Sequence, residues 1–186
     1  MGDSQIKGTA ILARLSFLDA QPSGRSKVVA SLSPEDQRAI SEILPIGLYP
    51  LSLKTRLDRL IAQTYRPDDP TAMYHEIGRW VAKKTFEHYH ANFLIAGNPQ
   101  ATMAKAPALR RAIQSDGSGA YTRTGDTSGM FVVTDAKDVD PLDCLATAGY
   151  WEYVVELAGG KRAKVKHTQC IGHGSKICEF KCTWDA

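Results

Sequence analysis

The chain has 186 residues, of which 43% are hydrophobic and 23% are charged, so its composition is that of one ordinary globular domain rather than a disordered, collagen-like or coiled-coil chain. Its net charge of +3 at pH 7 is too small to indicate nucleic-acid binding, because nucleic-acid binders concentrate positive charge far more. The first ten residues lack the charged-then-apolar pattern of a signal peptide, and no apolar run reaches the roughly 18 residues of a membrane span. We therefore expect a cytoplasmic protein with no membrane span and no nucleic-acid partner.

Helices dominate the first part of the chain. Apolar residues recur there at helical spacing, and Ser33-Pro34 and Asp69-Pro70 combine a capping side chain with a proline suited to the first helical position. We predict helices over residues 11–20, from Ser33 onward, around residues 53–61, from Asp69 to about Phe86, and from Pro99 to Ser115.

The last third of the chain is predicted to contain strands as well as one helix. Residues 116–135 are rich in glycine and β-prone residues, which predicts a hairpin, and Asp140-Pro141 starts a helix that Gly159-Gly160 ends. Two strands follow over residues 163–170 and 177–184. The prediction is a single α/β domain of the α+β kind over residues 1–186, in which a helical part (6–116) packs on a late helix and a small antiparallel sheet (117–186).

All four cysteines follow residue 143. In a reducing cytosol, cysteines grouped with histidine indicate metal ligands more often than disulfides. Cys144 lies in the first turn of the late helix, His167 and Cys170 end one strand, and Cys178 begins the next. Three thiolates and an imidazole are a common tetrahedral set for structural zinc. The pattern thus predicts a structural zinc site at Cys144, His167, Cys170 and Cys178.

Alternatives to this set exist. The four residues could instead be ordinary buried core residues, which is a common role for free cysteine. His173 could replace His167 as the fourth ligand, because both are three residues from Cys170. His167 and Cys170 differ in parity along a strand, so the site requires a bulge between them. Cys182 lies about 13 Å beyond Cys178 on an extended strand, which places it in the core.

The segment from Cys144 to Trp184 resembles the 4-vinyl reductase domain, whose end has a cysteine, a glycine-containing turn and Cys-x-Phe, as in CIGHGSKICEF here. In aromatic-sensing transcription activators with that domain, three cysteines and an acidic residue hold zinc. The resemblance places these cysteines at Cys144, Cys170 and Cys178, with His167 at the acidic position. The preceding part loosely resembles an uncharacterised bacterial family abundant in myxobacteria. The 4-vinyl reductase fold is itself similar to TRAPP tethering subunits and, distantly, to haem-nitric-oxide-binding domains.

These relatives imply an apolar pocket and a dimer. We expect a pocket of about 300 Å³ or more between the late helix and the sheet, lined by Phe131, Val133, Tyr150 and Tyr153. We expect a homodimer formed by the helical part, on residues such as Leu57, Leu60 and Ile77. His75, His88 and His90 are expected at the surface or an interface.

The predicted function is a non-enzymatic regulatory or ligand-binding domain with a structural zinc, which binds a small hydrophobic molecule, a protein partner or both. One alternative is a TRAPP-like dimeric interaction subunit. The other is an enzyme acting on a tetrapyrrole. No nucleophile elbow, P-loop or dinucleotide motif supports catalysis, and a closed site of four protein ligands leaves no position for a substrate.

Overall fold

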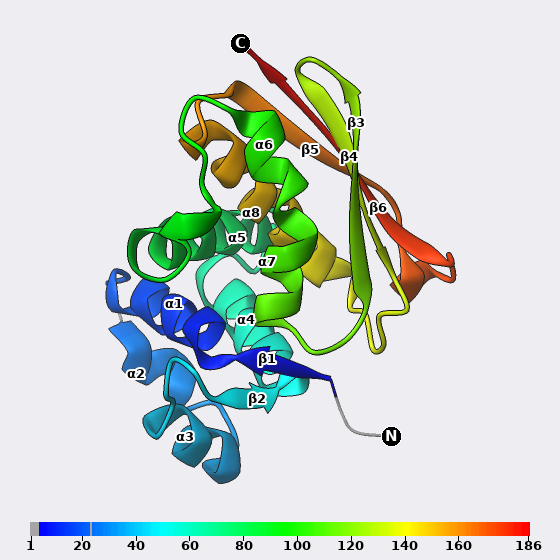
Figure 1. Cartoon of the computed structure of the whole chain (residues 1–186). Helices are drawn as coiled ribbons and strands as arrows, with labels where there is room; N and C mark the ends of the chain where they lie inside the picture. Colours follow the sequence, from blue (N-terminus) through cyan, green and yellow to red (C-terminus); the bar gives the residue numbers. More distant parts are fainter. Residues whose placement is uncertain (1–3, 23) are drawn as a thin grey trace.

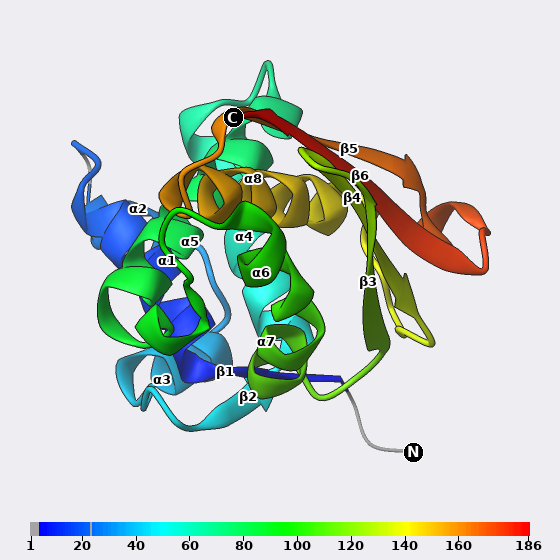
Figure 2. The ribbon, with the colours of Figure 1, turned by 45° about the horizontal axis from the view of Figure 1, so that its top comes forward.

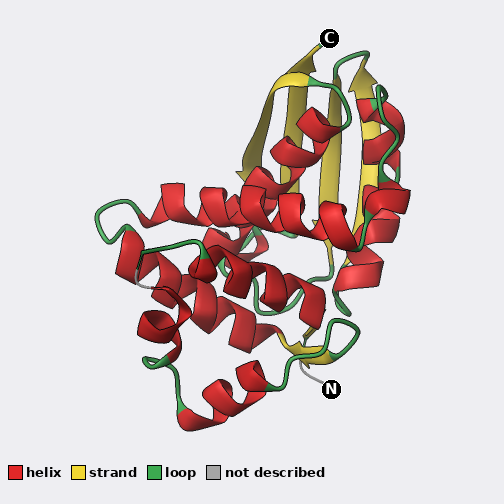
Figure 3. Cartoon of the chain, turned by 90° about the vertical axis from the view of Figure 1, so that its left-hand side faces the viewer, coloured by secondary structure: helices red, strands yellow, loops and turns green. Residues whose placement is uncertain are grey.

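The computed structural model describes residues 4–22 and 24–186; residues 1–3, which belong to the segment judged for a signal sequence, lie outside it. A group of helices covers one side of a four-stranded sheet (Figures 1 and 3). The predicted α+β class is confirmed. The helices are α1 (Gly8–Asp19), α2 (Gly24–Val29), α3 (Pro34–Ser41), α4 (Leu51–Tyr65), α5 (Pro70–His88), α6 (Pro99–Ala104), α7 (Ala106–Ile113) and α8 (Pro141–Leu157), with single 3-10 turns η1 (Ala91–Phe93) and η2 (Ile171–His173). The strands are β1 (Gln5–Lys7), β2 (Leu48–Pro50), β3 (Ser118–Gly125), β4 (Ser128–Thr134), β5 (Lys161–Gln169) and β6 (Ile177–Asp185).

Three helices begin at the predicted caps. The side chain of Ser33 accepts a hydrogen bond from the amide of the third residue of α3 at 3.2 Å. Asp69 does the same for α5 at 3.0 Å, and Asp140 accepts from the second residue of α8 at 3.0 Å. Each cap is followed by a proline, whose missing amide costs nothing at that position.

The helix predicted from Pro99 to Ser115 is divided into α6 and α7. Pro107 has no amide hydrogen to donate to the carbonyl of Met103 four residues earlier, so a continuous helix loses a bond there. The chain turns at Lys105, and α7 starts one residue later. Three short elements were not predicted: α2, and the strands β1 and β2, which pair with each other over three residues.

The four-stranded sheet is antiparallel in the order β3-β4-β6-β5. Two hairpins therefore meet where β4 pairs with β6, which puts Phe131 opposite Phe180 and Val133 opposite Cys178. The pairing of β5 with β6 shifts register between His167 and Gln169, so the predicted bulge is confirmed.

Helices α5 and α8 cross in close contact, and α8 packs on β5 and β6, while α6 and α7 pack on β3 (Figure 2). Two glycines permit the crossing. A Cβ on Gly78 would lie 1.9 Å from the carbonyl oxygen of Ala146, and a Cβ on Gly149 would lie 2.2 Å from that of His75. Neither position accepts a side chain without the helices moving apart.

Hydrophobic side chains form two clusters, one among α1, α4 and α5 and one between α8 and the sheet. The second also includes residues before position 117, such as Phe86 and Leu109. Of the residues expected at a dimer surface, Leu57 and Ile77 are fully buried in the first cluster, whereas Leu60 is half-buried. Leu57 and Ile77 therefore do not contribute to such a surface. Within the described part of the chain, no helix combines the length and the apolar character needed to cross a membrane.

Candidate metal centre and internal cavity

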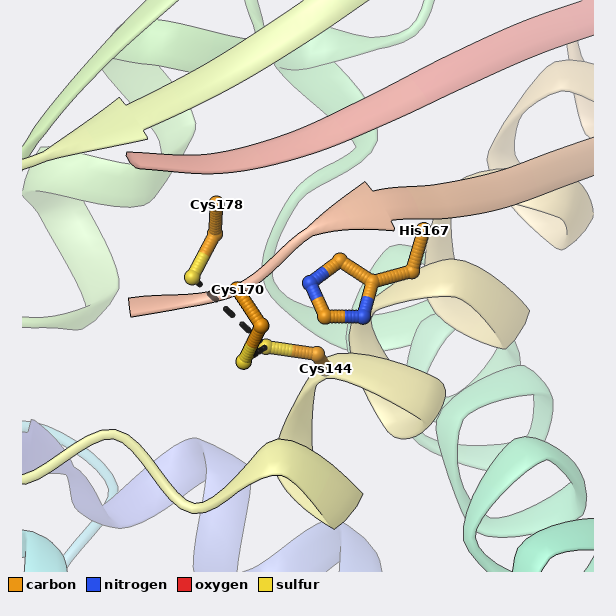
Figure 4. Close-up of side chains that lie close together, drawn as sticks. All are labelled: Cys144, His167, Cys170 and Cys178. Carbon is orange, nitrogen blue, oxygen red and sulfur yellow. Dashed lines mark hydrogen bonds between the residues drawn. The ribbon is translucent and has the colours of Figure 1, made fainter. Parts of the chain in front are cut away.

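Four potential metal ligands meet at one end of the sheet (Figure 4). They come from the first turn of α8, from β5, from the residue after β5 and from the second position of β6. One donor atom from each lies within 4.8 Å of the other three. The Sγ of Cys144 is 3.8 Å from that of Cys178 and 4.0 Å from that of Cys170. We call these residues the thiol cluster; they are Cys144, His167, Cys170 and Cys178.

The turn between β5 and β6 shapes the cluster. The carbonyl of Cys170 accepts hydrogen bonds from the amides of His173 and Ser175, at 3.1 and 3.0 Å. Gly174 ends the turn with a φ of +89°, a conformation that favours glycine. A Cβ on Gly172 would lie 2.3 Å from the carbonyl oxygen of Val139, so this glycine lets the turn reach the segment before α8.

His167 contributes an imidazole nitrogen that has no partner. Its ring stacks on Phe180 with the centroids 4.9 Å apart, and its Nε2 is buried without a hydrogen bond. Figure 4 shows the ring directed toward the sulfur atoms. Buried polar atoms are nearly always satisfied. An orphaned nitrogen beside three thiols therefore points to a missing ligand.

The thiols differ in acidity. The thiol of Cys144 donates to the sulfur of Cys178, the amide of Ile171 donates to the same sulfur at 3.4 Å, and His167 lies beside it. These contacts lower the pKa of Cys178 despite its burial. The same hydrogen bond, with burial and the neighbouring sulfurs, raises the pKa of Cys144. Cys178 thus becomes a thiolate readily, whereas Cys144 keeps its proton until a cation replaces it.

The two rival ligands lie outside the cluster. His173 is exposed at the tip of the turn. Cys182 is buried at 1% exposure on β6, where its thiol contacts the carbonyl of Phe180. The structure thus brings together the four residues selected from the sequence.

A cavity of about 170 Å³ lies between the two hydrophobic clusters. It is smaller than the pocket expected from the sequence. Phe131, Val133 and Tyr150 line it, together with Cys144 and Cys178 of the thiol cluster. Tyr153 does not line it; the guanidinium of Arg79 lies over its ring, 5.5 Å from the centroid.

His90 was expected at the surface or an interface, but it is buried inside the chain. It is 8% exposed and lines the cavity, packed edge-on against Phe86 and Phe93. Burial lowers its pKa, which favours the neutral imidazole. The sequence feature that could have indicated this burial is the position of His90 four residues after the apolar Phe86. The other two histidines are more exposed: His88 faces solvent, and His75 contacts Glu152 at 2.8 Å.

A buried ionic network, not recognised in the sequence, closes one end of the cavity. Asp58 contacts Arg14 at 2.6 Å and Lys54 at 3.2 Å, and Lys54 also contacts Asp143 at 2.6 Å. It links α1, α4 and the start of α8, next to Cys144. The four-residue spacing of Lys54 and Asp58 on α4 was its sequence signal.

Comparison with solved structures gives matches over almost the whole chain. Two structures of an S. oneidensis H-NOX protein superpose with TM-scores of 0.75 and 0.76 at 11% and 10% identity, and cover 97% of this chain and 100% and 97% of theirs. The Fe(II) unliganded H-NOX protein of K. algicida matches with a TM-score of 0.69 at 11% identity, over 97% of both chains. This is the H-NOX fold. No family model and no curated protein sequence matches the chain.

The H-NOX fold corrects two expectations. The structures compared above are H-NOX proteins rather than 4-vinyl reductase or TRAPP proteins, so the resemblance inferred from the last third of the chain is wrong. The resemblance rested on a hairpin with a cysteine on each side of its turn. Such a hairpin defines the local geometry but not which other strand pairs with it, so it does not identify the fold. The zinc cofactor is also corrected, because several of the matched structures are described with Fe(II) or heme.

Haem does not fit the residues present. The cavity, at about 170 Å³, is smaller than the roughly 300 to 1,000 Å³ of pockets that hold drug-sized ligands, and haem is larger than those ligands. Phe131 and Trp151, with ring centroids 5.3 Å apart, pack together in its wall. A haem would have to displace this aromatic core. Among the lining residues described, His90 offers the one imidazole.

Proposed function

We propose that this chain is a non-enzymatic regulatory domain whose thiol cluster binds one thiophilic metal ion. One observation carries the proposal: four soft or borderline donors, from elements far apart in the sequence, lie within 4.8 Å of one another. Thiolate and imidazole ligands favour such ions over magnesium or calcium.

The spacing of the sulfur atoms supports a tetrahedral ion. Metal–sulfur bonds of about 2.3 Å at tetrahedral angles separate two sulfurs by about 3.8 Å. The separations from Cys144, 3.8 and 4.0 Å, agree with this value. The unpaired Nε2 of His167 completes the set.

The non-enzymatic role is supported by the ligand count. Four protein ligands fill a tetrahedron and leave no position for a substrate or an activated water. The ion would join the first turn of α8 to the β5–β6 turn, and so connect the helical layer to the sheet. The H-NOX neighbours include a protein in an Fe(II)NO ligation state, so this fold also serves as a ligand-binding domain elsewhere. A cytoplasmic location is part of the proposal.

Titration of the metal-free full chain with Co²⁺ tests the proposal, because thiolate-bound Co²⁺ absorbs strongly in the visible and near-ultraviolet. We expect saturation at one equivalent for the wild type. Cys170→Ser and His167→Ala should weaken or abolish the signal. Cys182→Ser and His173→Ala are matched controls outside the cluster and should titrate like the wild type. A wild type without thiolate absorption, or loss in His173→Ala alone, would overturn the assignment.

We also propose a homodimer, on a different surface from the one first expected. Leu44, Ile46 and Leu48, next to α3, are 63%, 82% and 49% exposed. Three large apolar side chains this exposed within five residues are unusual for a surface without a partner.

A further inference from the structure

The cavity is partly open to solvent, since Lys137 and Asp138 in its wall are exposed. It lies between the two hydrophobic clusters, where α5 and α8 face α7 and the sheet. Its exposed lining is mainly apolar, from side chains such as Val81, Leu109 and Phe131, with polar and charged side chains between them. A mostly apolar cavity with a small number of placed polar groups is the usual form of a small-molecule site.

The volume limits the ligand. Engineered cavities of about 150 Å³ lined by Leu, Ile and Phe stay dry and bind benzene. The cavity here, at about 170 Å³, is close to that size. It therefore accommodates one six-membered ring with a short substituent.

Two buried polar atoms in the wall have no hydrogen-bond partner. They are Nε2 of His90 and the hydroxyl of Tyr150. Thr85 is the polar neighbour of the tyrosine, and its own hydroxyl donates to the carbonyl of Val81 at 2.8 Å; Tyr150 Oη makes no hydrogen bond of normal geometry. Both rings contact Phe86, at 6.0 and 6.3 Å between centroids, which places them at the same end of the cavity. A ligand with a hydrogen-bonding group would satisfy them.

The charges around the cavity balance. Arg14 and Lys54 are neutralised by Asp58 and Asp143 in the buried network. The remaining charged residues of the wall are two basic and two acidic: Arg110, Lys137, Asp138 and Asp140. Since burial also favours a neutral His90, no net charge is left to attract an ionised ligand.

We infer that this cavity binds a neutral molecule of one six-membered ring carrying a hydroxyl group, with the ring against Phe131 and the hydroxyl bonded to Tyr150 Oη and His90 Nε2. The site goes beyond the proposed metal binding. Cys144 and Cys178 line both sites, but their sulfur atoms are not needed to hold the ring.

Titration calorimetry on the full chain tests the inference with three probes of matched ring size: benzyl alcohol, toluene and benzoate. We expect saturable binding of benzyl alcohol, weaker binding of toluene and none of benzoate. Tyr150→Phe and His90→Leu should each weaken benzyl alcohol about threefold to tenfold, the effect of one lost hydrogen bond, and leave toluene unchanged. Tyr153→Phe and His88→Leu are matched controls outside the cavity and should bind like the wild type.

The absence of saturable binding by both neutral probes would overturn the inference. Equal binding of toluene and benzyl alcohol, or an unchanged affinity in both Tyr150→Phe and His90→Leu, would overturn the hydroxyl contact. Tyr150→Phe removes one atom and keeps the ring, so a circular dichroism spectrum like that of the wild type would show that it folds. The metal content of every sample should also be measured, so that failure of ring binding can be distinguished from failure of the proposed metal binding.

Discussion

At the residue scale, Asp58 is the most constrained charge in the described structure. Its side chain is completely buried, with Arg14 and Lys54 as its partners. Burial alone would raise its pKa, but the two positive charges outweigh that effect, and the pKa lies below its usual value. The folded protein therefore holds Asp58 ionised, and its contribution to stability depends on both partners staying in place.

Replacing Asp58 by Ala should lower the free energy of unfolding by about 3 to 5 kcal/mol at neutral pH, because Arg14 and Lys54 are left buried without a counter-charge. Urea denaturation measures this value. Asp126→Ala is the matched control: its carboxylate pairs with Arg123 but is 95% exposed, so its loss should change stability by less than about 1 kcal/mol.

The same carboxylate predicts an acid-sensitive stability. Because the folded pKa of Asp58 is lowered, its contribution is complete above the ordinary carboxyl pKa and is lost as pH falls through the lower, folded value. The wild type should therefore lose stability below about pH 4, and Asp58→Ala should lose less over the same range. Equal acid sensitivity in the two proteins would contradict this account.

At the element scale, the crossing of α5 and α8 sets the spacing between the two cores. Local signals predicted both helices, from Asp69-Pro70 and Asp140-Pro141, and the caps form as expected. The bulge beside His167 also followed from strand parity. The pairing of β4 with β6 did not, because it joins residues about fifty positions apart. No periodicity within a strand specifies its neighbour.

Substituting Gly78 by Ala tests the crossing. Alanine is the better helix former by about 1 kcal/mol, but its Cβ would lie 1.9 Å from the carbonyl of Ala146. The steric effect should prevail, because backbone atoms on both sides must move, and overpacking of this kind costs about 1 to 3 kcal/mol. We expect a lower melting temperature. Lys83→Ala, on the exposed face of α5, should leave it unchanged; a stabilised Gly78→Ala would contradict the close contact.

At the scale of the whole molecule, the sequence predicted which potential metal ligands lie together, but it did not predict the correct structural relatives. The four members of the thiol cluster were predicted from their types and spacing. The cavity, the buried His90 and the network around Lys54 were not, because each depends on side chains from several distant elements. At 10% to 11% identity, the H-NOX likeness rests on the arrangement of elements rather than on sequence motifs.

The proposed homodimer is tested by sedimentation. We expect the wild type to sediment as a dimer at tens of micromolar, and Ile46→Asp to sediment as a monomer, because a charge placed in an apolar interface is costly. Leu157→Asp, which changes a 40% exposed leucine on α8, should remain dimeric. A monomeric wild type would remove the proposal.

Native mass spectrometry of the intact chain tests the central claim about the thiol cluster most directly, because it reports the metal and its stoichiometry together. We predict a wild-type mass that exceeds the polypeptide mass by one metal ion per chain, with elemental analysis identifying the ion, and a Cys170→Ser mass equal to that of the polypeptide alone. A wild type at its polypeptide mass, both as purified and after incubation with Co²⁺, would contradict the assignment of a metal ion to Cys144, His167, Cys170 and Cys178.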